Sequence, residues 1–247
     1  MVWGHAQVGF GVAETGTMAL AFQPPLPRCA WWRRIWWGAF LALTCWASSV
    51  QAWDPDRLAS SAARHGVAAV QGVRALREVV GAALGRDEFA QLVAVNDFYN
   101  HRLTFREDVD NWGQIDYWAS PLESLQRSQA DCEDYAIAKY FTLVSMGVPH
   151  RKLRIVYVRV ATGGSVQPHM VMTYYPSPEA DPYVLDNLVG EVRRAGSRPD
   201  LSPVFSFNAD GLWEGVGAVV VGGAGPAERL SRWRDVLLKA RQDGFFQ

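Results

Sequence analysis

The chain has 247 residues, an apolar fraction of 49% and a formal net charge of −1. A charge this close to zero argues against a nucleic-acid-binding protein, and the apolar fraction argues against a largely disordered chain. A chain of this length can bury the core of one complete domain.

The N-terminal region predicts a targeting segment. Basic residues at Arg28, Arg33 and Arg34 precede an uncharged, almost wholly apolar run over residues 35–46. Roughly 12 residues suit the hydrophobic part of a signal peptide and are fewer than the about 20 that span a bilayer. The segment ends at Val50-Gln51-Ala52, which suits signal peptidase. We therefore expect residues 1–52 to be a cleaved signal segment, with an uncleaved N-terminal anchor as the alternative.

The remaining residues, 53–247, contain no linker and no internal repeat, so they predict a single domain. After cleavage of the signal segment, this domain would be exported and would not itself span the membrane. Two of the three cysteines, Cys29 and Cys45, lie in the predicted leader. Cys132 is then alone in an oxidising compartment, where cysteines are usually paired. A lone thiol there is either buried and inert or reactive.

The first half of the predicted domain is helical. Apolar residues recur at spacings of three and four from Asp54 to about Leu103, with Asp87 as the N-cap of a second helix. Ser120 followed by a proline predicts a short capped helix. A further helix is predicted over 132–146, capped by Asp131 and ended by Gly147.

The second half changes to a period of two. Strands are predicted over 153–160, 167–175 and 183–188, with weaker candidates at 204–207 and 218–221, and an amphipathic helix closes the chain over 227–242. Helices followed by strands predict an α+β fold in which N-terminal helices pack on an antiparallel sheet.

Three residues have the types that thiol catalysis needs. Cys132 would be the nucleophile, His169 the base and Asp186 the group that orients the base. A hairpin centred between Ser177 and Pro178 would place positions 169 and 186 directly opposite each other, where Cβ atoms are about 4.5–5.5 Å apart. Cys132 would begin its helix, where the partial positive charge lowers the pKa of a thiol. The other histidines of this region, His65, His101 and His150, are interpreted as solvated or capping residues.

Three carboxylates surround the thiol in sequence: Asp131, Glu133 and Asp134. They could serve as helix caps, which need no ligand. Their negative charge would, however, raise the pKa of Cys132 and oppose thiolate formation. A bound hard cation such as Ca²⁺ would remove that conflict. The residues alone leave both readings open.

The same segments resemble a known family, the bacterial transglutaminase-like cysteine proteinases of the LapG type. The resemblance runs from about Asn96 to Trp213, with order and spacing in agreement. It is carried by Asn111-Trp112-Gly113-Gln114, Asp116-Tyr117-Trp118, Asp131-Cys132-Glu133-Asp134-Tyr135, His169-Met170-Val171 and Val184-Leu185-Asp186-Asn187-Leu188.

The resemblance implies a papain- or transglutaminase-like fold and a periplasmic, calcium-dependent protease. Such enzymes cleave the N-terminal region of a large surface adhesin at a di-alanine site and release cells from biofilms. It implies Cys132, His169 and Asp186 as the triad and Asp131, Glu133 and Asp134 as calcium ligands. It also implies an inner-membrane cyclic di-GMP receptor that sequesters the protease. Two alternatives stay open: a peptidoglycan amidopeptidase or transglutaminase on the same fold, and a non-catalytic binding protein.

Overall fold

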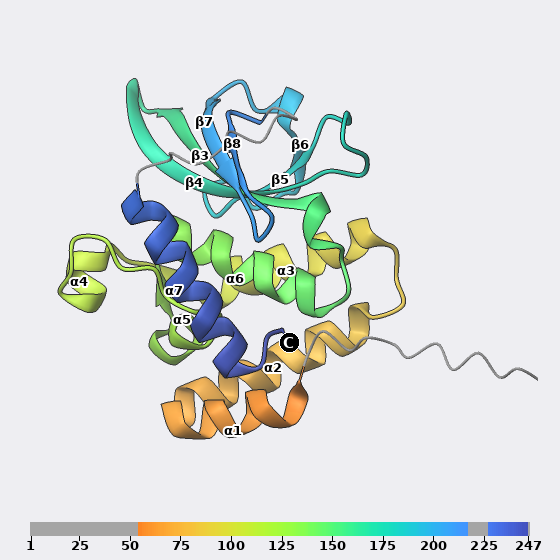
Figure 1. Ribbon diagram of the computed structural model, residues 1–247, viewed down its shortest axis with the longest axis vertical. Coiled ribbons are helices and arrows are strands. Elements are labelled where there is room, and N and C mark those ends of the chain that lie inside the picture. Colours follow the sequence, from red (N-terminus) through yellow and green to blue (C-terminus); the bar gives the residue numbers. More distant parts are fainter. Residues whose placement is uncertain (1–53, 217–226, 247) are drawn as a thin grey trace, which may run out of the picture. The chain divides into compact units, whose positions relative to one another are not determined.

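The computed structural model describes residues 54–216 and 227–246 (Figure 1). The predicted leader, residues 1–52, and the weak strand predicted at 218–221 lie outside the described residues. Among the helices that the structure describes, none combines the length and apolar character needed to cross a bilayer.

Seven α-helices and eight strands make up the described fold. The helices are α1 (Pro55–His65), α2 (Val67–Ala83), α3 (Glu88–Arg102), α4 (Asp108–Trp112), α5 (Pro121–Arg127), α6 (Cys132–Ser145) and α7 (Ala227–Asp243), with short 3₁₀ turns η1 (His150–Lys152) and η2 (Ala195–Ser197). The strands are β1 (Thr104–Phe105), β2 (Gln129–Ala130), β3 (Leu153–Thr162), β4 (Ser165–Tyr174), β5 (Tyr183–Leu185), β6 (Arg193–Arg194), β7 (Leu201–Phe207) and β8 (Leu212–Glu214).

The helix ends follow the capping residues in the sequence. Asp87 accepts a hydrogen bond from the backbone N–H of Ala90, and Ser120 forms a reciprocal capping box with Glu123. Gly66, at a φ of +98°, separates α1 from α2, so the first predicted helical stretch is two helices. Gly147, at a φ of +92°, follows the end of α6, as predicted.

The main sheet is antiparallel and has the strand order β6-β5-β4-β3-β7-β8. One face packs on the helical layer, because α6 contacts both β3 and β4 as well as α3 and α5. Met170, Met172 and Tyr174 of β4 are buried in this core, as their alternation predicts. The predicted α+β fold with helices on an antiparallel sheet is confirmed.

Helix α6 is the centre of this arrangement. Eleven of its residues are buried, so its position is fixed on several sides by packing. Two short segments, β1 and β2, form a parallel pair immediately before it, with Phe105 opposite Ala130. Through this pairing, the loop that leads into α4 lies beside the first turn of α6.

Candidate active site

Cys132 is the first residue of α6 and is partly exposed. Asp131 is the N-cap, since its side chain accepts a hydrogen bond of 3.3 Å from the backbone N–H of Asp134. The thiol donates a hydrogen bond of 3.0 Å to Oε2 of Glu133. The Cys132 side chain is therefore at the positive end of a helix dipole but paired with a carboxylate.

His169 and Asp186 form a buried pair. Nε2 of His169 lies 2.8 Å from Oδ1 of Asp186, and the two residues are 5% and 1% exposed. This pairing occupies Nε2 and leaves Nδ1 to take a proton from a nucleophile. The backbone N–H of Met170, the residue after His169, faces the Cys132 sulfur and lowers the pKa of the thiol, against the larger effect of burial. The structure thus pairs His169 with Asp186 and places the Cys132 sulfur beside Met170, the next residue along β4.

Arg198 completes the histidine side of the site, and the sequence analysis missed it. Its Nη2 donates 2.8 Å to Oδ2 of Asp186 and 2.7 Å to Oδ2 of Asp200. Burial alone raises the pKa of Asp186, but the bonds from His169, Leu188 and Arg198 outweigh it and lower the pKa to about 2. Asp186 is accordingly held as a carboxylate.

The predicted strand register was wrong by two residues. Met172 pairs with Leu185 and Tyr174 with Tyr183, so position 169 is not directly opposite position 186. A shift of two keeps every side chain on its face of the sheet, which makes the two residues diagonal neighbours. The third strand also ends at Leu185 instead of Leu188, because the Asp186 side chain accepts a bond from the backbone N–H of Leu188.

The remaining histidines have surface roles. His150 lies 3.0 Å from Oδ2 of exposed Asp210, His101 contacts the carbonyl of Asp97 at 2.8 Å and His65 contacts Gln126 at 2.8 Å. None of these pairings involves the Cys132 thiol.

Acidic side chains gather around the start of α6. Oxygen atoms of Asp108, Asp131 and Asp134 lie within 4.8 Å of one another, and so do those of Asp108, Asp116 and Glu133. The cluster therefore contains the three predicted acids and two more, Asp108 of α4 and Asp116 of the following loop.

These acids are held in place by backbone groups of the loop before α5. Asp108 accepts a hydrogen bond from the backbone N–H of Tyr117, and Asp134 accepts one of 2.7 Å from Ala119. One carboxylate oxygen on each of Asp108, Asp116 and Asp134 is nevertheless buried without a hydrogen-bond partner. Buried acceptors are seldom left unsatisfied, so these oxygens are suited to bind a cation or an ordered water molecule.

The electrostatics of the cluster are unfavourable for a thiolate. Burial, followed by the charges of neighbouring carboxylates, raises the pKa of Asp131 and Asp134. Burial, followed by the Glu133 carboxylate, raises the pKa of Cys132. A set of buried carboxylate oxygens with unsatisfied lone pairs fits a hard cation such as Ca²⁺. A capping role and a cation-binding role are compatible, because Asp131 caps α6 and also belongs to the cluster.

Comparison with known proteins identifies the family of this chain. The sequence profile of the bacterial transglutaminase-like cysteine proteinases matches residues 71–198. This chain belongs to that family. No curated protein sequence matches it.

Solved structures of Legionella pneumophila LapG are similar to this member of the family. One is 34% identical, with a TM-score of 0.63, and the match covers 75% of this chain and 97% of that one. An EGTA-treated form is 35% identical with a TM-score of 0.64, again over 75% and 97% of the two chains. A calcium-bound form is 34% identical with a TM-score of 0.62, over 75% and 98%.

Some of this proteinase's site residues could have been found from the sequence and others could not. Asp116 stands in the Asp116-Tyr117-Trp118 motif, which was noted for its aromatic residues only. Asp108 and Arg198 carry no local signal. Lys139 of α6 is fully buried, and burial lowers its pKa to about 7 against the opposing charges of Asp186 and Asp97.

The aromatic residues of the motifs at 111–114 and 116–118 have different roles. Trp118 is core, because it is 4% exposed and stacks on Phe207 with ring centroids 5.6 Å apart. Trp112 and Tyr117 pack on each other at 4.5 Å and are partly exposed. Tyr117 lies beside Asp116 in a groove of about 570 Å³ that α7 closes on the other side.

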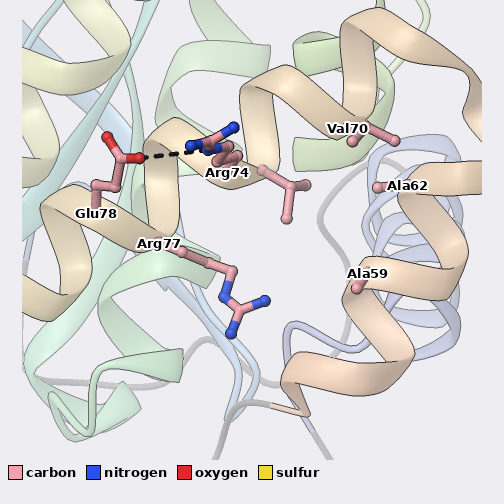
Figure 2. Close-up of a pocket in the computed structure, with 7 residues that line it drawn as sticks. Ala59, Ala62, Val70, Arg74, Arg77 and Glu78 are labelled. Carbon is pink, nitrogen blue, oxygen red and sulfur yellow. Dashed lines mark ion pairs between the residues drawn. The ribbon is translucent and has the colours of Figure 1, made fainter.

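Two further grooves of the described structure exclude Cys132 and the acidic cluster. One, of about 640 Å³, lies between α3 and the loop from Val189 to Arg193. The other, of about 400 Å³, lies between α1 and α2, where Figure 2 shows Arg74 paired with Glu78. Neither groove contains a residue of the predicted triad.

Proposed function

We propose that this chain is a calcium-dependent periplasmic cysteine endopeptidase. Cys132 is the nucleophile, His169 the general base and Asp186 the residue that orients the base. The observation that carries this proposal is the buried His169–Asp186 pair beside a thiol at a helix N-terminus. Membership of a cysteine proteinase family supports it.

The reaction begins when Nδ1 of His169 takes the thiol proton, while Nε2–H remains bonded to Asp186. The thiolate attacks a peptide carbonyl, and the backbone N–H of Cys132, which has no partner within the described residues, stabilises the oxyanion. His169 then gives its proton to the leaving amine, and a thioester remains. A water molecule, deprotonated by His169, hydrolyses the thioester to a carboxylic acid and the free thiol.

The cation expected here is Ca²⁺, as in the calcium-bound LapG structure. Asp131, Glu133 and Asp134 would hold it together with Asp108 and Asp116. When bound, it would supply positive charge that offsets these carboxylates and so favours ionisation of the thiol. The unpartnered oxygens of Asp108, Asp116 and Asp134 support this assignment.

The substrate that the family resemblance favours is the N-terminal region of a large surface adhesin, cleaved at a di-alanine site. Cleavage there would release cells from a biofilm. An inner-membrane cyclic di-GMP receptor would be the regulatory partner that sequesters the enzyme.

The test is cleavage of an adhesin N-terminal fragment by the mature protein and by Cys132→Ala. We expect the wild type to cut the fragment, EGTA to stop the reaction and excess Ca²⁺ to restore it, and Cys132→Ala to be inactive under all conditions. Terbium luminescence or calorimetry would measure metal binding independently of activity. Cleavage by Cys132→Ala would exclude the mechanism, and full activity in EGTA would return the acids to a capping role.

Murein fragments and an amine acceptor, incubated with the enzyme in parallel, separate the protease from the two alternative enzymes. Turnover of either in place of the adhesin fragment would replace the proposed substrate while keeping the triad. A biological effect that survives in Cys132→Ala would indicate a binding protein.

A further inference from the structure

Strand β4 has an open edge beside the candidate nucleophile. Its whole length, Ser165–Tyr174, pairs with β3, but β5 pairs only with Met172–Tyr174. On the β5 side, the part of β4 from 165 to 171 has no strand partner within the described residues (Figure 1). This edge leads directly to His169.

Hydrogen bonding at the two ends of β4 determines which of its residues direct their backbone groups toward β3. The N–H of Tyr175, just after β4, donates 2.7 Å to the carbonyl of Lys152, just before β3. At the other end, Thr162 and Ser165 flank a two-residue turn of glycines with φ values of +57° and +82°. In such hairpins the flanking pair is hydrogen-bonded. Odd-numbered residues of β4 therefore direct their N–H and C=O groups toward β3.

Even-numbered residues consequently direct theirs toward the open edge. Met170, whose N–H faces the Cys132 sulfur, belongs to this even-numbered set. Pro168 has no N–H and would interrupt the ladder if it faced β3, whereas an edge position tolerates proline. The edge thus presents the N–H and C=O of Val166 and the C=O of Pro168.

These edge groups are free. Within residues 54–216 and 227–246, no backbone or side-chain hydrogen bond involves the N–H or C=O of Val166 or the C=O of Pro168. Residues 165–168 are exposed. An edge with unpaired donors and acceptors is a template for another strand.

We propose that the substrate binds by adding a strand to this edge. The carbonyl of Pro168 accepts a hydrogen bond from a substrate N–H, and Val166 pairs through its N–H and C=O. The substrate class is therefore an extended, unstructured segment of a protein chain, recognised through its main chain as in other cases of β-strand addition. This inference rests on the proposed endopeptidase function.

The position of the thiol relates strand addition to catalysis. Because Met170 N–H points from β4 toward the sulfur, the thiol lies where the backbone of an added strand would run. Two residues along a strand span about 7 Å, so the bond to Pro168 falls within about two residues of the scissile carbonyl. Strand addition would therefore hold the carbonyl against Cys132 with His169 alongside.

The test compares Val166→Pro with Val166→Ala, using the adhesin N-terminal fragment as the probe. Proline removes the edge N–H without removing a bond to β3, and alanine removes only the side chain. We expect Val166→Pro to lower kcat/KM about tenfold, mainly by raising KM, and Val166→Ala, which keeps both main-chain groups, to lose several-fold less. Alkylation of Cys132 by iodoacetamide, which needs no strand, should proceed at the wild-type rate in both variants.

A second arm does not depend on folding of a variant. Peptides that span the mapped cleavage site are each N-methylated at a single position and offered to the wild-type enzyme. We expect sensitivity at every second N–H on one side of the scissile bond, with a loss of about tenfold at each sensitive position. Equal cleavage of all methylated peptides, or equal behaviour of the two Val166 variants, would overturn strand addition while leaving the protease intact. Failure of the wild type to cut the unmodified fragment would overturn the proposed function and this inference with it.

Discussion

The two halves of the candidate site differ in how their charges are balanced. On the histidine side, Asp186 is bonded to both His169 and Arg198, and its pKa is lowered to about 2. On the cysteine side, burial and mutual repulsion raise the pKa of Asp131 and Asp134, and burial with the Glu133 charge raises that of Cys132. The proposed base and its orienting residue are therefore balanced by Arg198, whereas the proposed nucleophile lies among mutually repelling carboxylates, of which Asp116 pairs with Arg232.

The two halves therefore differ in how their carboxylates affect the stability of the fold and in how that stability would depend on a bound cation. A carboxylate with two buried cationic or hydrogen-bonding partners stabilises the fold. Buried carboxylates without such partners destabilise it until a cation binds, and binding to the native state then adds stability. Substitutions in the two halves should consequently respond to calcium in opposite ways.

The largest effect is expected on the balanced side, for Arg198→Met. Removing one partner of a buried ion pair costs about 3–5 kcal/mol, and the remaining bond from His169 places the loss near the lower end. Urea unfolding measures the change, and added Ca²⁺ should not restore it. Arg198→Lys, which keeps the charge, should recover part of the loss.

Arg193→Met is the matched control for this prediction. Arg193 is exposed and pairs with exposed Glu191, so its removal should change the free energy of unfolding by less than about 0.5 kcal/mol. Equal effects at the two arginines would show that Arg198 does not hold Asp186.

The next effect is expected on the unbalanced side, for Asp108→Asn. Losing one oxygen ligand's charge should weaken calcium binding about 10- to 100-fold in a calorimetric titration. Without calcium the same substitution should raise the melting temperature, because it relieves repulsion within the cluster. This reversal of sign distinguishes a metal ligand from a structural residue.

Asp110→Asn is the control for the metal site. Asp110 lies in the same short helix but is exposed and outside the acidic cluster. It should change neither the calcium affinity nor the melting temperature. If Asp108→Asn behaved in the same way, Asp108 would not be a ligand.

The range of the interactions explains which parts of the site could be read from the sequence. The start of α6 follows from Asp131 and its contact three residues away, and the His169–Asp186 pairing follows from strand periodicity. The register error of two residues was harmless because an even shift preserves the face. These are local or short-range signals.

Asp108 and Arg198 could not be found in this way. Asp108 reaches the cluster because the irregular segment 105–118 folds back onto α6, an arrangement set by the β1–β2 pairing and by its bond to Tyr117. Arg198 reaches Asp186 from the turn before β7, where no periodic pattern operates. When segments without periodic structure pack on distant parts of the chain, their contacts leave no regular residue spacing in a single sequence.

The smallest effect is the contribution of Asp186 to the dependence of stability on pH. Its pKa is lowered from the ordinary value of 3.8 to about 2, so the Asp186 carboxyl gives up its proton more readily in the folded protein than in the unfolded chain. The resulting stabilisation, about 2 kcal/mol, is fully present above pH 4 and is lost as the pH falls through about 2. The measurement is urea unfolding of the wild type and Asp186→Asn at pH values from 5 to 2. The difference between the two proteins should shrink by this amount across the window, because only the wild type carries the ionised carboxylate. A constant difference would mean that the pairing with His169 and Arg198 does not depend on the charge of Asp186, and the contrast between the two halves of the site would fail.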